Sequence, residues 1–126
     1  MSEETSTLIV DEELILAAVA ARTATLTGTG KAIGPTGQVE AQVVVSDYAA
    51  TPSIVVHIQQ SDDDGVADAY ADNEVAVGVT IAPVAAADKK IYRIPFTATK
   101  KYVRTYVVHA DADSITYGVY VTTKGN

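Results

Sequence analysis

The fold is decided by three stretches in the last third of the chain, IYRIPFT (91–97), KYVRTYVVHA (101–110) and SITYGVYVT (114–122). Each stretch is rich in β-branched and aromatic residues, which favour strands over helices. The links between them, 98–100 and 111–113, are short, and short links commonly join neighbouring antiparallel strands. The pattern predicts three consecutive strands arranged as a meander.

Two further strands are predicted upstream, because apolar and polar residues alternate with a period of two in 39–47 and 54–59. The segment 48–52 between them is short enough for a hairpin-like connection. The same alternation selects the residues that we expect in the core, which are Val43, Val45, Val56, Ile58, Val107, Ile115 and Val119.

Residues 21–27 and 74–81 also read as strands, and the glycines and proline within 28–37 indicate a loop. About seven short strands without a βαβ unit indicate an all-β fold, an antiparallel β-sandwich or jelly roll. Residues 8–21 fit either a helix or a strand, and we expect residues 1–20 to form an extended N-terminal arm. Residues 21–126 would then form a single β-sandwich domain, which suits a chain of 126 residues.

Composition excludes several classes of function. The chain has no cysteine, so disulfides, thiolate metal sites and cysteine nucleophiles are ruled out. A net charge of -7 argues against binding to nucleic acid, which depends on clustered Lys and Arg. No apolar run approaches the ~20 residues that cross a bilayer, and the polar N-terminus is unlike a signal peptide. We therefore expect a soluble protein without cofactors.

Charge is distributed unevenly along the chain. Residues 32–88 contain nine acidic residues and no Lys or Arg, whereas residues 89–104 contain six basic residues and no acid. In a sandwich, the two segments can lie on different edges. The sequence therefore suggests a subunit with one negative and one positive surface, complementary to its own copies or to a charged partner.

No residue pattern predicts catalysis. Asp62-Asp63-Asp64-Gly65 resembles a calcium loop, but with Gly65 in the glycine position of an EF-hand the last ligand would be Ala71. A solvated turn is the main interpretation, and a looser calcium site within Asp62–Asp72 is the alternative. His57 and His109 lack metal-ligand spacing. Because no nucleophile motif is present either, we expect a protein that is not an enzyme.

One strand carries candidate interface residues. Period-two alternation puts Tyr102, Arg104 and Tyr106 on one face, where the guanidinium could stack on either ring. These residues could form a stabilising cross-strand cluster, or they could anchor a partner, because Tyr and Arg are enriched at interaction hot spots. The full set of candidate interface residues is Tyr102, Arg104, Tyr106, Lys100, Lys101 and Arg93.

The order of segments resembles the small jelly-roll cement proteins that decorate tailed-phage heads, of the Bordetella-phage type. The likeness covers roughly residues 39–122 and is carried by Gln59-Gln60-Ser61-Asp62-Asp63, Tyr92-Arg93-Ile94-Pro95 and Lys101-Tyr102-Val103-Arg104-Thr105-Tyr106. It implies an antiparallel jelly roll without enzymatic activity. It further implies a homodimer or homotrimer that binds the major capsid protein on the outer capsid surface of the virion.

A second interpretation is a β-sandwich that binds a carbohydrate or a host receptor, with calcium held in the Asp62–Asp72 loop and tyrosines stacked on sugar rings. The absence of Trp and the position of most tyrosines within strands favour the cement interpretation.

Overall fold

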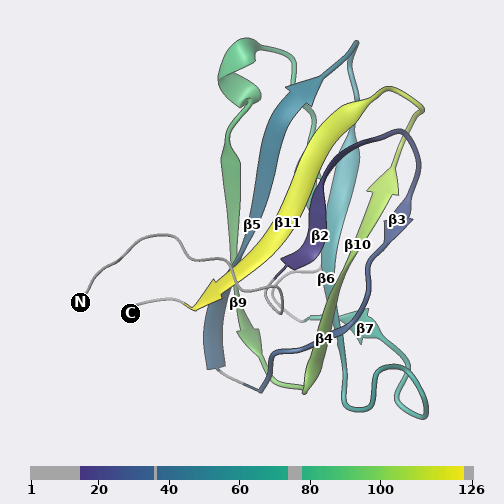
Figure 1. Ribbon diagram of the computed structural model, residues 1–126, viewed down its shortest axis with the longest axis vertical. Helices are drawn as coiled ribbons and strands as arrows, with labels where there is room; N and C mark the ends of the chain where they lie inside the picture. Colours follow the sequence, from purple (N-terminus) through teal and green to yellow (C-terminus); the bar gives the residue numbers. More distant parts are fainter. Residues whose placement is uncertain (1–14, 36, 74–77, 124–126) are drawn as a thin grey trace.

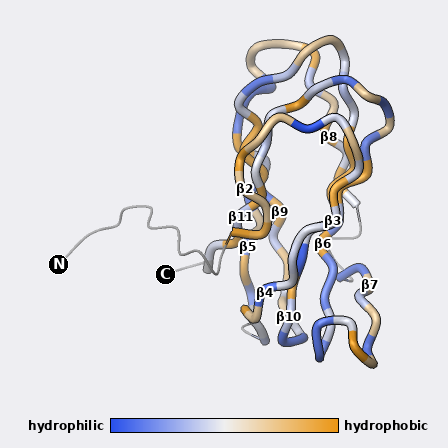
Figure 2. The backbone as a smooth tube through the Cα atoms, turned by 45° about the vertical axis from the view of Figure 1, so that its right-hand side comes forward, coloured by the Kyte–Doolittle hydropathy of each residue, from blue (hydrophilic) through white to orange (hydrophobic). Residues whose placement is uncertain are grey.

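The computed structural model describes residues 15–35, 37–73 and 78–123, which form two facing antiparallel sheets (Figures 1 and 2). The four-stranded sheet has the order β2-β11-β5-β9. Its strands are β2 (Ile15–Arg22), β11 (Ile115–Thr123), β5 (Gly37–Tyr48) and β9 (Ile91–Ala98).

The six-stranded sheet has the order β3-β10-β6-β7, with β4 also paired to β10 and β8 also paired to β6. Its strands are β3 (Leu26–Thr27), β4 (Lys31–Ala32), β10 (Tyr102–His109), β6 (Ile54–Ser61), β7 (Ala71–Asp72) and β8 (Val79–Ile81). A short 3-10 turn, η2 (Ala86–Asp88), is the only helical element among the described residues. The all-β, antiparallel prediction is thus confirmed.

The core lies between the two sheets. All seven residues expected there, from Val43 to Val119, are at most 2% exposed. Tyr117, Ile54 and Ile81 are also fully buried. The prediction of the buried face is therefore confirmed for β5, β6, β10 and β11.

The predicted connections within sheets are wrong. The segment after β5 leads to β6 in the opposite sheet, so it is not a hairpin, and β9, β10 and β11 alternate between sheets instead of forming a meander. Thus β9 pairs with β5, β10 with β6, and β11 with both β2 and β5. The physical reason is that a short link can join two strands of one sheet or cross the sandwich, while alternation specifies only which side of a strand is buried.

The N-terminal elements also differ from expectation. Residues 1–14 of the predicted arm lie outside the described residues, but 15–22 form β2, which pairs with β11 and buries Leu16 and Ala17. The strand expected at 21–27 is divided, because β2 ends at Arg22 and the chain crosses to β3 in the other sheet. Of the strand expected at 74–81, the structure describes β8, and 74–77 lie outside the described residues.

A buried polar network joins the two sheets at one end of the core. Gln60 on β6 donates from Nε2 to Thr99 Oγ1 (2.7 Å) just after β9. Asn73 donates from Nδ2 to the carbonyl of Thr97 on β9 (2.8 Å) and to Gln60 Oε1 (3.3 Å). Because Gln60 and Asn73 are 8% and 2% exposed, these bonds satisfy amides that would otherwise be costly to bury.

Candidate interaction face

The outer face of the six-stranded sheet carries three of the six candidate interface residues. Along β10, Tyr102, Arg104 and Tyr106 are partly exposed, while the intervening Val103 and Thr105 are buried. The predicted common face of these three side chains is therefore confirmed. On the neighbouring strand β6, Gln59 lies opposite Arg104 and His57 lies opposite Tyr106.

Arg104 is fixed by two contacts from different parts of the chain. Its Nε donates to Gln59 Oε1 (3.0 Å), and its guanidinium carbon lies 4.1 Å from the centre of the Tyr70 ring. The sequence allowed stacking on Tyr102 or Tyr106, but alternate side chains on a strand stand about 7 Å apart and roughly parallel. Tyr70, which follows the acidic loop, instead places its ring under the guanidinium.

Asp72 on β7 orders the other half of this surface. Its Oδ2 lies 3.1 Å from His57 Nδ1, and its Oδ1 accepts a hydrogen bond from Gln59 Nε2 (3.0 Å). The His57 and Tyr106 rings are 5.8 Å apart between centroids. We call the seven residues His57, Gln59, Tyr70, Asp72, Tyr102, Arg104 and Tyr106 the tyrosine–arginine face.

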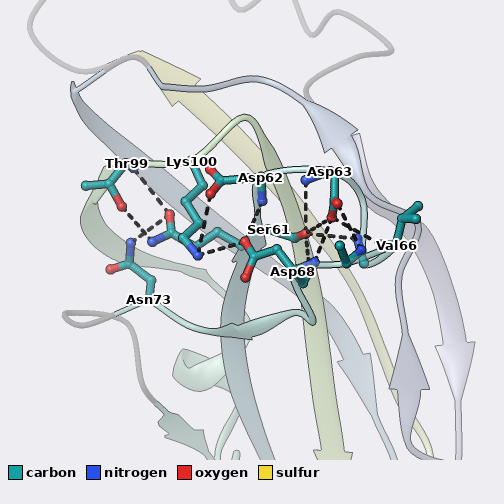
Figure 3. Close-up of polar contacts among 11 residues, drawn as sticks. Ser61, Asp62, Asp63, Val66, Asp68, Asn73, Thr99 and Lys100 are labelled. Carbon is teal, nitrogen blue, oxygen red and sulfur yellow. Dashed lines mark hydrogen bonds and ion pairs between the residues drawn. The ribbon is translucent and has the colours of Figure 1, made fainter.

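The acidic loop after β6 is held by its own carboxylates (Figure 3). Asp63 accepts backbone N–H groups from Val66 (3.1 Å), Ala67 (2.9 Å) and Asp68 (3.0 Å). These bonds, led by the one from Asp68, lower the pKa of Asp63. Ser61 Oγ adds a bond to the carbonyl of Asp68 (2.5 Å). The loop is therefore a compact, hydrogen-bonded turn.

Tyr70 connects this loop to the tyrosine–arginine face. Its hydroxyl donates to Asp64 Oδ1 (2.7 Å). Burial, followed by the hydrogen bond to Asp64, raises the pKa of Tyr70 well above its usual range, so the phenol remains protonated. Among residues 15–35, 37–73 and 78–123, no three His, Cys, Asp or Glu side chains are grouped as a metal site.

Of the remaining three candidates, two lie in the β9–β10 turn and one lies in the opposite sheet. Lys100, in the β9–β10 turn, binds Asp68 Oδ2 (2.7 Å), a hydrogen bond that raises the pKa of Lys100 and lowers that of Asp68. Lys101 lies over the Tyr102 ring at 5.4 Å. Arg93 is on β9 in the opposite sheet, where it pairs with Glu40 (2.9 Å). Arg93 is therefore separate from the other five.

The expected separation of charge into two surfaces is incomplete. Three of the six basic residues in 89–104 form ion pairs with the acidic segment of the same chain: Arg93 with Glu40, Lys89 with Asp47 (3.5 Å), and Lys100 with Asp68. Because β5 and β9 are neighbours, Glu40 and Arg93 come together although they are 53 residues apart. The two segments therefore neutralise each other in part.

Sequence reasoning missed four members of the tyrosine–arginine face. His57 and Gln59 could have been found, because they share the outward phase of β6. Tyr70 and Asp72 carry no local signal, since only the path of the loop brings them to β10 and β6. His109 is unrelated to this face: its Nε2 lies 2.9 Å from the hydroxyl of buried Tyr117, and its pKa is lowered chiefly by burial.

Comparisons with known proteins add no relationship. No protein-family model matches the sequence, and a search of curated proteins finds no match. Within the described part of the chain, no helix has the length and apolar character needed to span a bilayer.

Proposed function

We propose that this chain is a non-enzymatic capsid cement protein of a tailed phage, which binds the major capsid protein on the outer surface of the head. The supporting observation is that two segments of the resemblance, Gln59-Gln60-Ser61 and Tyr102-Val103-Arg104, lie side by side in register on β6 and β10. Elements more than 40 residues apart in the sequence thus build one surface.

The strand order supports the finer proposal of a jelly roll. If β3 with β4, and β7 with β8, are each taken as one interrupted strand, the described residues form eight strands. When these strands are numbered 1 to 8 in chain order, the two sheets have the strand orders 1-8-3-6 and 2-7-4-5. Such an alternation between two antiparallel sheets is that of a double Greek key, on which jelly rolls are built.

We further propose that the tyrosine–arginine face contacts the shell. The side chains are already ordered in the free chain, because Arg104 is held by Gln59 and Tyr70, and Asp72 holds His57 and Gln59. Pre-ordered aromatic and arginine side chains lose little conformational entropy on binding, which makes them efficient anchors. Repetition of one modest contact at many equivalent sites would then strengthen a shell by multivalency.

The test is to mix the purified protein with expanded phage heads from which this protein is missing, and to measure binding. The heads come from the phage that encodes the protein. Tyr106→Ser should weaken binding about tenfold or more, the usual effect of removing an aromatic anchor. Tyr120→Ser is the matched control, because Tyr120 is a partly exposed tyrosine on the outer side of the opposite sheet. Its binding should equal that of the wild type.

Two outcomes would contradict different parts of this proposal. Failure of the wild-type protein to bind heads would remove the capsid role and favour the carbohydrate- or receptor-binding alternative. Equal weakening by Tyr106→Ser and Tyr120→Ser would retain the capsid role but would place the contact elsewhere.

A further inference from the structure

An open groove lies between the two sheets where β2 faces the segment from β3 to β4. It has a volume of about 510 Å³, and its apolar lining includes Leu16, Ala17, Ala18 and Leu26. Arg22 and Lys31 also line it. Thr27 and Thr29 are also part of the lining, so the groove combines an apolar part with a polar part that carries two cationic side chains.

Neither cation is neutralised by the described part of the chain. Arg22 donates to backbone carbonyls, those of Tyr117 (2.6 Å) and Ala18 (2.7 Å), and its charge has no carboxylate partner there. Lys31 likewise forms no ion pair with a described residue. In a chain with a net charge of -7, two cations without a described carboxylate partner, in a groove that is also partly apolar, favour an occupant that presents both apolar and acidic groups.

The acidic loop of the same chain has that chemistry. Its tip residue, Val66, is 85% exposed, and the loop carries Asp62, Asp63, Asp64 and Asp68 against one paired cation among the described residues, Lys100. The three backbone N–H bonds to Asp63 hold the tip in place (Figure 3). The loop projects at one end of the molecule, near β7 (Figure 1). A rigid, projecting valine in an acidic loop is therefore available to another molecule.

We infer that the Val66 loop of one copy docks into the β2–β3 groove of a second copy. Net charge decides between the two most exposed valines of the described residues. Val84 is 73% exposed, but the carboxylate beside it, Asp88, is followed directly by Lys89 and Lys90, so this segment has no net negative charge. The loop of Val66 keeps a net negative charge, because Lys100 is the one described cation paired with its four aspartates. This inference concerns self-association only, so it does not rest on the capsid role.

The contact joins two different surfaces, so repetition produces a ring or an open chain instead of a closed two-fold dimer. One valine and a few charges make a small interface, which implies weak association, with a dissociation constant of about 0.1 mM. Such a contact is largely dissociated in dilute solution. The associated form becomes common where several copies of the chain are held close together.

The experiment is sedimentation velocity of the full chain from about 10 µM to about 1 mM at low salt. Val66→Ser and Lys31→Glu should each weaken association about tenfold or more, through loss of apolar burial and reversal of charge respectively. Val84→Ser is the matched control, with the same substitution at an exposed valine elsewhere, and it should associate like the wild type.

A mixing experiment tests whether the loop and the groove meet each other. Val66→Ser protein keeps an intact groove, and Lys31→Glu protein keeps an intact loop. At about 0.1 mM each variant alone should be largely monomeric, whereas the mixture should form a 1:1 dimer that does not grow further. A wild-type chain that stays monomeric at about 1 mM would overturn the inference, as would a mixture without dimers. The inference would also be overturned if removal of residues 1–14 abolished association while Val66→Ser did not, because the contact would then belong to that segment.

Discussion

Gly30 lies so close to Tyr70 that a Cβ atom at residue 30 would overlap the phenol oxygen. Asp64 Oδ1 would also obstruct such an atom. Glycine at this position therefore allows Tyr70 to reach both Asp64 and the guanidinium of Arg104. The tyrosine–arginine face thus depends on a residue that is not part of it.

Gly30→Ala should displace Tyr70 and lower stability by about 1 to 3 kcal/mol, the usual cost of overpacking. Thermal melting measures the loss, and the NMR signal of Arg104 Nε–H reports whether the stacked ring has moved. Gly78→Ala is the control, because its Cβ would come no closer than 3.3 Å to the side chains of His57 and Val55. Tyr70→Phe in the Gly30→Ala background should restore part of the stability. An unshifted Arg104 signal in Gly30→Ala would contradict the packing described.

Ile58→Ala should reduce the free energy of unfolding by about 2 to 5 kcal/mol, because Ile58 is 0% exposed and its truncation leaves a cavity. Ile91→Ala removes the same atoms from a side chain that is 45% exposed, so it should cost well under half as much. Denaturant unfolding of both variants gives the comparison. Equal losses would show that Ile58 is not in the core.

The acidic loop should lose stability in acid. The pKa of Asp63 is below its usual 3.8, chiefly because of the backbone bond from Asp68. Its contribution to stability is therefore present above pH 3.8 and is lost as the pH falls through the lower, folded-state pKa. Asp63→Asn should lower the melting temperature at pH 7. It should also reduce the further decrease in melting temperature below about pH 4. Asp62→Asn serves as the neighbouring control and should change neither. An unaltered acid profile in Asp63→Asn would contradict the role of this carboxylate.

Calcium should have no effect on stability. Both carboxylate oxygens of Asp63 accept backbone N–H groups, and Asp68 Oδ2 accepts from Lys100 and from the backbone of Asp62. A calcium ion would have to displace these donors. We expect the melting temperature to change by less than about 1 °C with about 5 mM calcium or a chelator. A calcium-dependent rise of several degrees would instead support the carbohydrate- or receptor-binding alternative.

Local alternation was sufficient to predict the main strands and their buried faces. It placed Val43 and Ile58 in the core and Tyr102, Arg104 and Tyr106 on one outward face, because a strand turns successive side chains to opposite sides whatever its neighbours are. The same reasoning failed for the pairing of β9, β10 and β11. Pairing depends on hydrogen bonds to strands distant in the sequence, about which the pattern of one strand says nothing.

The sequence by itself determined an acidic, cysteine-free, all-β chain, since composition and period-two alternation are properties of each segment alone. Only the tertiary structure decided which charges neutralise each other, that Tyr70 supports Arg104, and that Arg22 and Lys31 line one groove. Arg104 and Gln59 are 45 residues apart, and Arg93 and Glu40 are 53 apart. Such contacts arise when two sheets close over a common core, because burial of apolar faces, not proximity along the chain, selects which strands meet.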